Sequence, residues 1–203
     1  MLAIGVKNIK AHYSYDIQVN KFRQQDWKPV VNIMPIIELD GKKPKIDPSA
    51  FVAPNATIIG DVEIGEGCSI WYGAVIRGDL AKIRIGKFNS IQDNSVIHGD
   101  GPTTIGDNCV LAHGCCVHGA TIGSRSLVSI NSIVFDGAVI GEESIVGLGA
   151  VVLANTKVPP RTVMGGVPAK PLRQATDKDV ALVKLGNKGY FELSRRYKAQ
   201  KLG

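Results

Sequence analysis

Aliphatic residues recur every six positions through most of this chain, in four runs that together make nineteen hexads. The runs start at Val52, Ile85, Ile105 and Ile122, and Met164 closes the last one. A six-residue period fits neither the 3.6-residue turn of an α-helix nor the two-residue alternation of a long β-strand. It is typical of short parallel strands wound into a solenoid, with one hexad on each face. We therefore expect an all-β solenoid.

The corners of such a solenoid need small residues. In most hexads a small residue stands two positions before the aliphatic, as at Ala56, Cys68, Ala74, Ser95 and Ala138. Large aliphatics would fill the interior, while the small residues would fit the tight corners. Glycine often follows the aliphatic directly, at Gly65, Gly86, Gly106, Gly123 and Gly141. We expect these glycines to supply positive φ angles at the corners.

The repeat divides the chain into an N-terminal extension (residues 1–35), a solenoid domain (36–172) and a C-terminal helical segment (173–203). In the last segment, Thr176 and Asp179 have the spacing of a capping box, which predicts the start of a helix. We expect a first helix from Thr176 to Leu185 and a second over residues 190–202. Between them, Gly186–Gly189 should interrupt the helix, because glycine disfavours helical backbone.

The net charge of +6 is unevenly distributed, because residues 46–168 carry more acidic than basic side chains. An acidic solenoid argues against a nucleic-acid groove along it, so we expect no nucleic-acid partner. No apolar run approaches the ~20 residues of a membrane-spanning helix, so we expect no membrane segment. The basic C-terminal segment fits a solvated helix face, with contact to an acidic partner as the alternative.

The phase of the hexads explains three of the four cysteines. Cys68, Cys109 and Cys115 occupy the small inward position, whereas Cys116 is out of phase and should face outwards. The chain shows no disulfide framework, which is typical of a reducing compartment, and we expect a cytoplasmic protein. The lysine-rich N-terminal extension leaves organelle targeting open as an alternative, although its aspartates count against it.

The same phase brings two histidines together. Arg77, His98 and His118 each follow a core aliphatic by one residue, in the fifth, eighth and eleventh hexads. If three hexads make one coil, these residues stack on one edge of successive coils, about 4.8 Å apart. His98 and His118 can then converge on one metal ion, whose bonds to imidazole nitrogen are about 2.0–2.1 Å long.

A third histidine has a different phase. His113 follows Leu111 by two residues and belongs to the neighbouring face of the coil that carries His118. Its side chain should therefore point away from the ion that His98 and His118 share. A cyclic trimer would solve this, because the face that carries His113 in one subunit can meet the edge that carries His118 in the next. We expect a metal site between subunits of a homotrimer.

Several motifs together resemble the γ-class carbonic anhydrase family of hexapeptide-repeat proteins. They are Arg77-Gly78-Asp79, Ile91-Gln92-Asp93-Asn94, Val96-Ile97-His98, Ala112-His113-Gly114 and Val117-His118-Gly119. The resemblance covers about residues 36–203, and residues 165–170 are similar both to this family and to hexapeptide acyltransferases. It implies a left-handed parallel β-helix with a C-terminal α-helix, a homotrimer, and metal sites at the subunit interfaces.

The resemblance also implies carbon dioxide as substrate and bicarbonate as product. Three neutral imidazoles would leave a zinc ion its +2 charge and an open position, where a bound water is acidified to a pKa near 7. Iron and cobalt suit the same ligands. By resemblance, Arg77 and Asp79 would form a salt bridge between subunits, and Gln92 would orient the hydroxide or bicarbonate. Asp93 would fix a ligand or close a turn, and Tyr190 would lie near the metal, as in the short-loop branch of the family.

Departures from the better-studied branch of the family keep other functions open. Leu80 stands where that branch has a glutamate, and only Gly99–Ile105 joins two hexads where it has a longer acidic loop. The carboxylates of that loop serve proton transfer. Slow hydration of carbon dioxide, or another small substrate, is therefore an alternative. So are a hexapeptide-repeat acyltransferase, which would use one histidine as general base, and a non-catalytic metal-binding or assembly protein.

Overall fold

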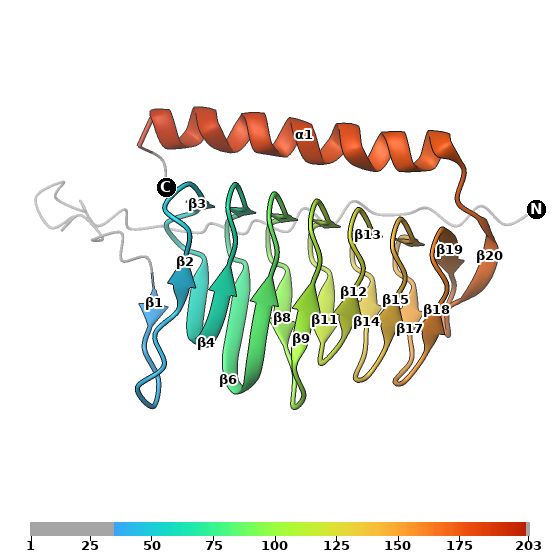
Figure 1. Cartoon of the computed structure of the whole chain (residues 1–203), viewed down its shortest axis with the longest axis horizontal. Helices are drawn as coiled ribbons and strands as arrows, with labels where there is room; N and C mark the ends of the chain where they lie inside the picture. Colours follow the sequence, from blue (N-terminus) through green and yellow to red (C-terminus); the bar gives the residue numbers. More distant parts are fainter. Residues whose placement is uncertain (1–34, 202–203) are drawn as a thin grey trace, which may run out of the picture. The chain divides into compact units, whose positions relative to one another are not determined.

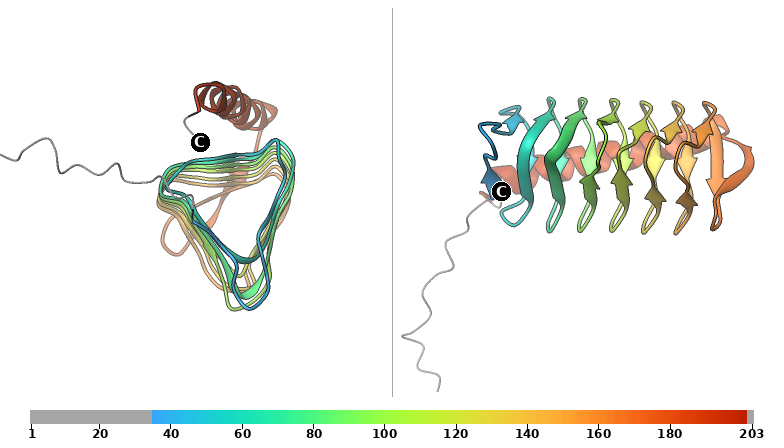
Figure 2. Two further views of the ribbon diagram at one scale, coloured as in Figure 1. Left: turned by 90° about the vertical axis from the view of Figure 1, so that its left-hand side faces the viewer. Right: turned by 90° about the horizontal axis from the view of Figure 1, so that it is seen from below.

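The computed structural model describes residues 35–201, which form a parallel-strand β-solenoid of about seven turns followed by one helix (Figure 1). A view along the solenoid shows a three-sided cross-section, with the helix lying over one side (left view of Figure 2). The all-β solenoid predicted from the hexads is thereby confirmed. The three sides are called here the helix face, the histidine face and the third face.

Short strands make up each face. On the helix face lie β3 (Phe51–Val52), β5 (Ser69–Ile70), β7 (Ser90–Ile91), β10 (Val110–Leu111), β13 (Leu127–Val128), β16 (Ile145–Val146), β19 (Thr162–Gly165) and β20 (Lys170–Gln174). The first seven are parallel, and β20 pairs antiparallel with β19.

The other two faces share one sheet, because two long strands turn the corner between them. The strands that turn are β4 (Thr57–Ile64) and β6 (Val75–Ile85). The histidine face continues with β8 (Val96–His98), β11 (Cys116–His118), β14 (Ile133–Val134) and β17 (Val151–Val152), and begins with β1 (Ile36–Ile37). The third face holds β2 (Lys45–Ile46), β9 (Thr103–Ile105), β12 (Thr121–Ile122), β15 (Val139–Ile140) and β18 (Lys157–Val158).

Each hexad pairs with the hexad three further along the chain. Ile76 pairs with Ile97, Ile97 with Val117, and Val117 with Val134, all in parallel register. These aliphatics are buried, together with the small residues two positions before them. Three hexads therefore make one coil, and residues of equal phase stand directly above one another.

Glycine occupies the positions directly after the aliphatics for a different reason from the positive φ angle that was expected. Gly65, Gly86 and Gly106 do not have positive φ angles. A Cβ on Gly65 would lie 2.7 Å from the carbonyl oxygen of Gly86 on the next coil. The left-handed residues come two positions later, as at Gly67 and Phe88. The prediction of positive φ was wrong at these positions, because close approach of successive coils, rather than backbone conformation, excludes a side chain.

One helix, α1 (Asp177–Ala199), runs along the helix face (Figure 1). The capping box is confirmed, since the Thr176 hydroxyl accepts from the Asp179 backbone N–H and the Asp179 carboxylate accepts from the Thr176 N–H. The predicted break at Gly186–Gly189 was wrong, because the helix is continuous there. A glycine costs a helix about 1 kcal/mol relative to alanine, and packing against the solenoid outweighs that cost.

Aromatic rings and an amide hold α1 on the helix face. Tyr190 and Tyr197 contact Trp71 edge-on, with ring centroids 5.4 and 5.3 Å apart. Between these rings and the start of the helix, the Nδ2 of the buried Asn187 donates to the carbonyl oxygen of Phe88 at 2.8 Å. Val183 packs on Val110 and Ala112 of the helix face. The helix therefore has a fixed position, and its side chains can contribute to a site on the solenoid.

The last strand of the solenoid continues slightly past the boundary that the repeat predicts. Strand β20 ends at Gln174, two residues beyond the domain boundary expected at 172. Within residues 35–201, no helix is long and apolar enough to cross a bilayer. Organelle targeting by the N-terminal extension, the alternative to a cytoplasmic protein, concerns residues that lie outside the described part of the chain, apart from Pro35.

Replacing two glycines by alanine should have opposite effects on stability. Gly65→Ala places a methyl group against backbone of the next coil and should destabilise the fold by about 1–3 kcal/mol, as overpacking does. Gly186→Ala lies in the exposed part of α1, where nothing beyond the adjoining helix backbone comes within 4 Å of the new Cβ, and should stabilise the fold by about 0.5–1 kcal/mol. Thermal unfolding midpoints at equal protein concentration measure both. A lower midpoint for Gly186→Ala would contradict a continuous helix.

Candidate metal site

His98 and His118 form a pair on one edge of the solenoid, as their phase predicts. They end strands β8 and β11 and are direct partners in the parallel register. His98 Nδ1 lies 3.3 Å from His118 Nε2, and the rings meet at 66°. The side chains are 12% and 22% exposed, so both rings are largely shielded yet reachable.

A carboxylate holds the outer nitrogen of each ring in this pair. Asp79 Oδ1 lies 2.9 Å from His98 Nε2, and Asp136 Oδ1 lies 2.6 Å from His118 Nδ1. Because a carboxylate only accepts hydrogen bonds, the ring nitrogen that faces it carries the hydrogen. When both rings are neutral, the two inner nitrogens, His98 Nδ1 and His118 Nε2, carry lone pairs that face each other.

The separation of the inner nitrogens fits a shared cation. Two ligands of a tetrahedral ion with bonds of about 2.0–2.1 Å lie about 3.3–3.4 Å apart, and the observed separation is 3.3 Å. Two facing lone pairs repel each other unless a positive charge lies between them. The pair could therefore supply two imidazole ligands to a tetrahedral ion with zinc-like bond lengths.

Arg77 continues the same edge one coil earlier. Its guanidinium forms an ion pair with Asp79 of the same chain. Burial raises the pKa of the Asp79 carboxyl, but hydrogen bonds from Arg77, the Leu80 N–H and His98 outweigh burial, so the net pKa lies below its ordinary value. Asp79 is therefore ionised at neutral pH and accepts from both Arg77 and His98. The salt bridge expected between subunits stays a prediction.

His113 forms a separate cluster at the corner between the helix face and the histidine face. Its Nδ1 lies 2.9 Å from Asp93 Oδ2, and its Nε2 accepts from the Tyr190 hydroxyl at 3.0 Å. Burial, followed by the charge of Asp93, raises the pKa of Tyr190, so this hydroxyl keeps its proton at neutral pH. Asp93 thus fixes a histidine, one of the two roles expected for it, and α1 contributes Tyr190 to the cluster.

One chain does not bring all three histidines together. Among residues 35–201, no three His, Cys, Asp or Glu side chains are placed to hold one ion. His113 follows β10, whereas His98 and His118 end β8 and β11 at the other edge of the histidine face. The structure thus separates the pair from His113, as the phase argument requires.

Gln92 lies in the coil corner next to Asp93. It is only 4% exposed, and its phase places it between Trp71 and Ala112 of the adjacent coils. Its backbone N–H donates to Leu111, but its side-chain amide makes no hydrogen bond to another described residue. The amide is therefore available to a bound molecule at this corner.

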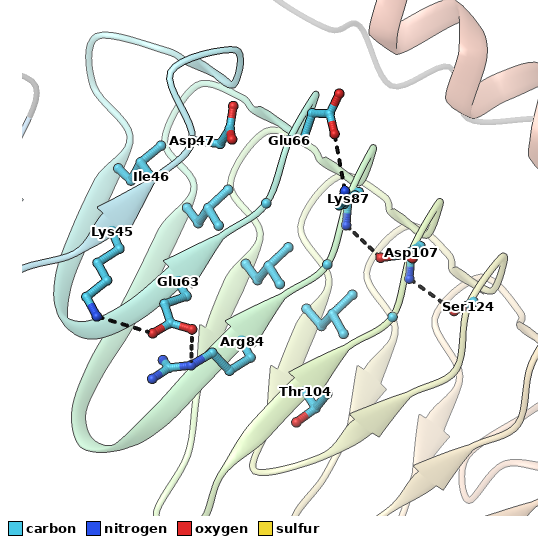
Figure 3. Close-up of a pocket in the computed structure, with 16 residues that line it drawn as sticks. Lys45, Ile46, Asp47, Glu63, Glu66, Arg84, Lys87, Thr104, Asp107 and Ser124 are labelled. Atoms are coloured by element: carbon cyan, nitrogen blue, oxygen red, sulfur yellow. Dashed lines mark hydrogen bonds and ion pairs between the residues drawn. The ribbon is translucent and has the colours of Figure 1, made fainter.

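A large groove elsewhere shows none of these features. It has a volume of about 810 Å³ and follows the corner between the third face and the helix face (Figure 3). Its charged side chains are largely paired with one another, since Glu63 contacts both Lys45 and Arg84. None of the candidate site residues lines it. Size alone therefore does not indicate the functional site.

Asp136 is the site residue that the hexad analysis missed. It follows Phe135, whose ring stacks on His118 with centroids 5.3 Å apart. Its signal in the sequence is its place on the His98–His118 edge, one coil beyond His118 and one residue later. The edge therefore extends further along the chain than the histidines themselves.

The fold and the repeat define a class, the hexapeptide-repeat parallel β-solenoids. A family profile described as bacterial transferase hexapeptide (six repeats) matches residues 43–78. A carbonic anhydrase of Geobacillus kaustophilus is 41% identical over 78% of this chain and 88% of its own. Gamma carbonic anhydrase 1, mitochondrial, of Arabidopsis thaliana is 36% identical over 78% of this chain. This chain matches 61% of that plant relative's length.

Two solved structures share the fold. A hexapeptide transferase family protein from Anaplasma phagocytophilum is 40% identical, with a TM-score of 0.79 over 81% of this chain and 98% of its own. A Bacillus cereus protein with a provisional acetyltransferase name is 37% identical, with a TM-score of 0.80 over 81% and 97%. The chain belongs to the γ-class carbonic anhydrase-like family of hexapeptide-repeat proteins.

The four thiols should differ sharply in reactivity. Burial raises the pKa of Cys68 to about 11 and those of Cys109 and Cys115 to about 12, so these three stay protonated and inaccessible. Cys116 is half-buried on the histidine face, and burial raises its pKa as well. We expect a thiol reagent to label at most one cysteine in the folded protein, faster at pH 9 than at pH 7 because thiolate is the nucleophile. Labelling of two or more cysteines before unfolding would contradict the inward phase.

Proposed function

We propose that this protein is a metal-dependent carbonic anhydrase that hydrates carbon dioxide to bicarbonate at sites between the subunits of a homotrimer. The observation that carries the proposal is the geometry of the histidine pair, in which the inner nitrogens of His98 and His118 lie 3.3 Å apart. The names of the relatives support the activity, because several are called carbonic anhydrases.

The third ligand would come from a neighbouring copy. His113 is 43% exposed, and Asp93 holds its Nδ1 as Asp136 holds that of His118. Its Nε2 is bonded only to the Tyr190 hydroxyl, among the described residues, and that hydroxyl can turn away when another partner arrives. An imidazole in this state is ready to complete a pair presented by a second subunit.

The surface between the two half-sites supports this assembly. Beyond His118, its edge continues with Phe135 and Leu153, and beyond His113 the opposite edge continues with Ile130 and Leu148. All four side chains are exposed in one chain, as is Ile133 between the two edges. Apolar side chains gathered on one face are typical of a subunit interface. Pairing of the two edges between copies would bury them and bring His113 to the pair.

The chain's own residues then have defined tasks. A divalent zinc, iron or cobalt ion held by three imidazoles would supply the charge that makes water acidic enough to give hydroxide near neutral pH. The Gln92 amide would orient the bicarbonate or its precursor through a hydrogen bond. Tyr190 would offer its hydroxyl beside His113, and Arg77 would keep Asp79 ionised so that it orients His98.

An acyltransferase is the second candidate. The Asp93–His113 contact at 2.9 Å is the arrangement of a general base and the carboxylate that orients it, and the Bacillus cereus neighbour has an acetyltransferase name. Transfer from acetyl-coenzyme A by metal-free protein would favour this candidate. A protein that binds metal but shows neither activity would be a binding or assembly protein.

We expect the protein to act in the cytoplasm, because its four cysteines are free thiols, as a reducing compartment maintains them. An organelle is the alternative. The names of the Arabidopsis relatives state a mitochondrial location for those proteins.

Metal content should depend on all three histidines. We expect about one metal ion per chain in the parent and almost none in His98→Ala, His113→Ala or His118→Ala, because each site would lose one of three ligands. Elemental analysis measures this, and light scattering checks that the trimer remains. His12→Ala, outside the repeat, is the matched control and should keep its metal and the parent's rate of carbon dioxide hydration. Full metal in His113→Ala would contradict a site between subunits.

Mixed trimers give a sharper test of sharing between chains. A site is complete only when a His113→Ala chain supplies the His98–His118 pair and the neighbouring His118→Ala chain supplies His113. In cyclic trimers formed from equal amounts of the two chains, about one site in four meets this condition. Metal content should therefore recover to about a quarter of the parent's, although neither variant binds metal alone. If both ligand sets belonged to a single chain, mixing would restore nothing.

A further inference from the structure

Each of the three histidines has an aspartate of its own. Asp79 contacts His98, Asp93 contacts His113 and Asp136 contacts His118, at 2.9, 2.9 and 2.6 Å. Asp79 and Asp93 belong to motifs that already point to the site. Asp136 stands outside them, and its contact is the shortest of the three.

The backbone places the Asp136 carboxylate over the preceding coil. A Cβ on Gly119 would collide with Asp136 Oδ1, so this carboxylate reaches His118 only because residue 119 is a glycine. The Asn155 N–H donates to the Asp136 carbonyl at 2.7 Å and fixes the coil from the other side. The His118 ring is then held by stacking on Phe135 and by Asp136 at Nδ1.

Other polar side chains also lie over glycines but without this contact. Asn94 lies over Gly73 and Asn131 over Gly114, where the asparagines themselves adopt left-handed backbone. Asp136 is not left-handed, and its oxygen is bonded to an imidazole instead. Filling the space above a glycine therefore does not explain the aspartate.

Charge distinguishes Asp136 from Asp79 as well. Arg77 neutralises Asp79, whereas no lysine or arginine of the described chain forms an ion pair with Asp136. An uncompensated carboxylate behind an imidazole increases the electron density that the ring offers to a cation on its other side. The negative charge of Asp136 is thus free to balance a divalent ion.

We propose that Asp136 is the positioning residue of His118: it keeps the hydrogen on Nδ1, aims Nε2 at His98, and strengthens His118 as a metal ligand. This inference rests on the proposed metal site, but its first consequence concerns the metal-free protein. There, the neutral His118 ring should carry its hydrogen on Nδ1, because the Asp136 carboxylate can only accept.

The test compares Asp136→Ala, Asp136→Asn and a control. Asp107→Asn is the matched control, since Asp107 also lies over a glycine (Gly86) and accepts from the Lys87 N–H at 2.7 Å, away from the histidines. Imidazole ¹⁵N shifts in metal-free protein report the tautomer. Zinc affinity is measured by competition with a chelator of known affinity.

Asp136→Ala should give a mixture of His118 tautomers and weaken zinc binding about 10–100-fold, the usual cost of losing such a partner. Asp136→Asn keeps an acceptor oxygen and should retain most of the Nδ1–H tautomer, while zinc binding weakens because the charge is gone. Asp107→Asn should leave both readouts as in the parent.

Unchanged ¹⁵N shifts and an unchanged zinc affinity in folded Asp136→Ala would overturn the inference. If that variant does not fold, the zinc affinity of Asp136→Asn is the test, and binding as tight as the parent's would overturn the positioning role of Asp136. A parent that takes up none of zinc, iron or cobalt would refute the proposed function, whereas the tautomer of His118 in metal-free protein would still decide the role of Asp136.

Discussion

Parallel pairing between successive coils is the constraint on which the rest of this structure depends. Each hexad pairs with the one three further on, so residues of equal phase lie one strand spacing apart, about 4.8 Å. A shift of one residue would turn the core aliphatics outwards. The register that buries Ile97 and Val117 therefore also places His98 beside His118. The pair is determined as firmly as the core itself.

The three-sided cross-section divides the chemistry between two edges. One edge carries the histidine pair with Asp79 and Asp136, and the other carries His113 with Asp93 and Tyr190. The edges bound one face, which becomes apolar towards its C-terminal end. A single chain would thus present two complementary halves of the proposed site. Because these halves lie on opposite edges of the face, the proposed site would be complete only in an assembly of copies.

Local sequence rules failed where packing decides. The helix across Gly186–Gly189 is continuous because Asn187 and Tyr190 dock on the solenoid, and this outweighs the weak intrinsic preference of glycine. Gly65 was expected to provide a positive φ angle, but glycine is needed there because a Cβ would collide with the backbone of the next coil. Neither contact lies within the window of residues that a local pattern samples.

The sequence by itself determined the coil, its interior, and the phases of His98, His118 and His113, because the six-residue period converts position along the chain into position around the solenoid. Only the tertiary structure decided which groups hold those histidines. Asp136 lies 18 residues from His118, and Tyr190 lies 77 residues from His113. Such contacts depend on how far side chains reach between coils and on where α1 docks. The six-residue repeat encodes neither of these.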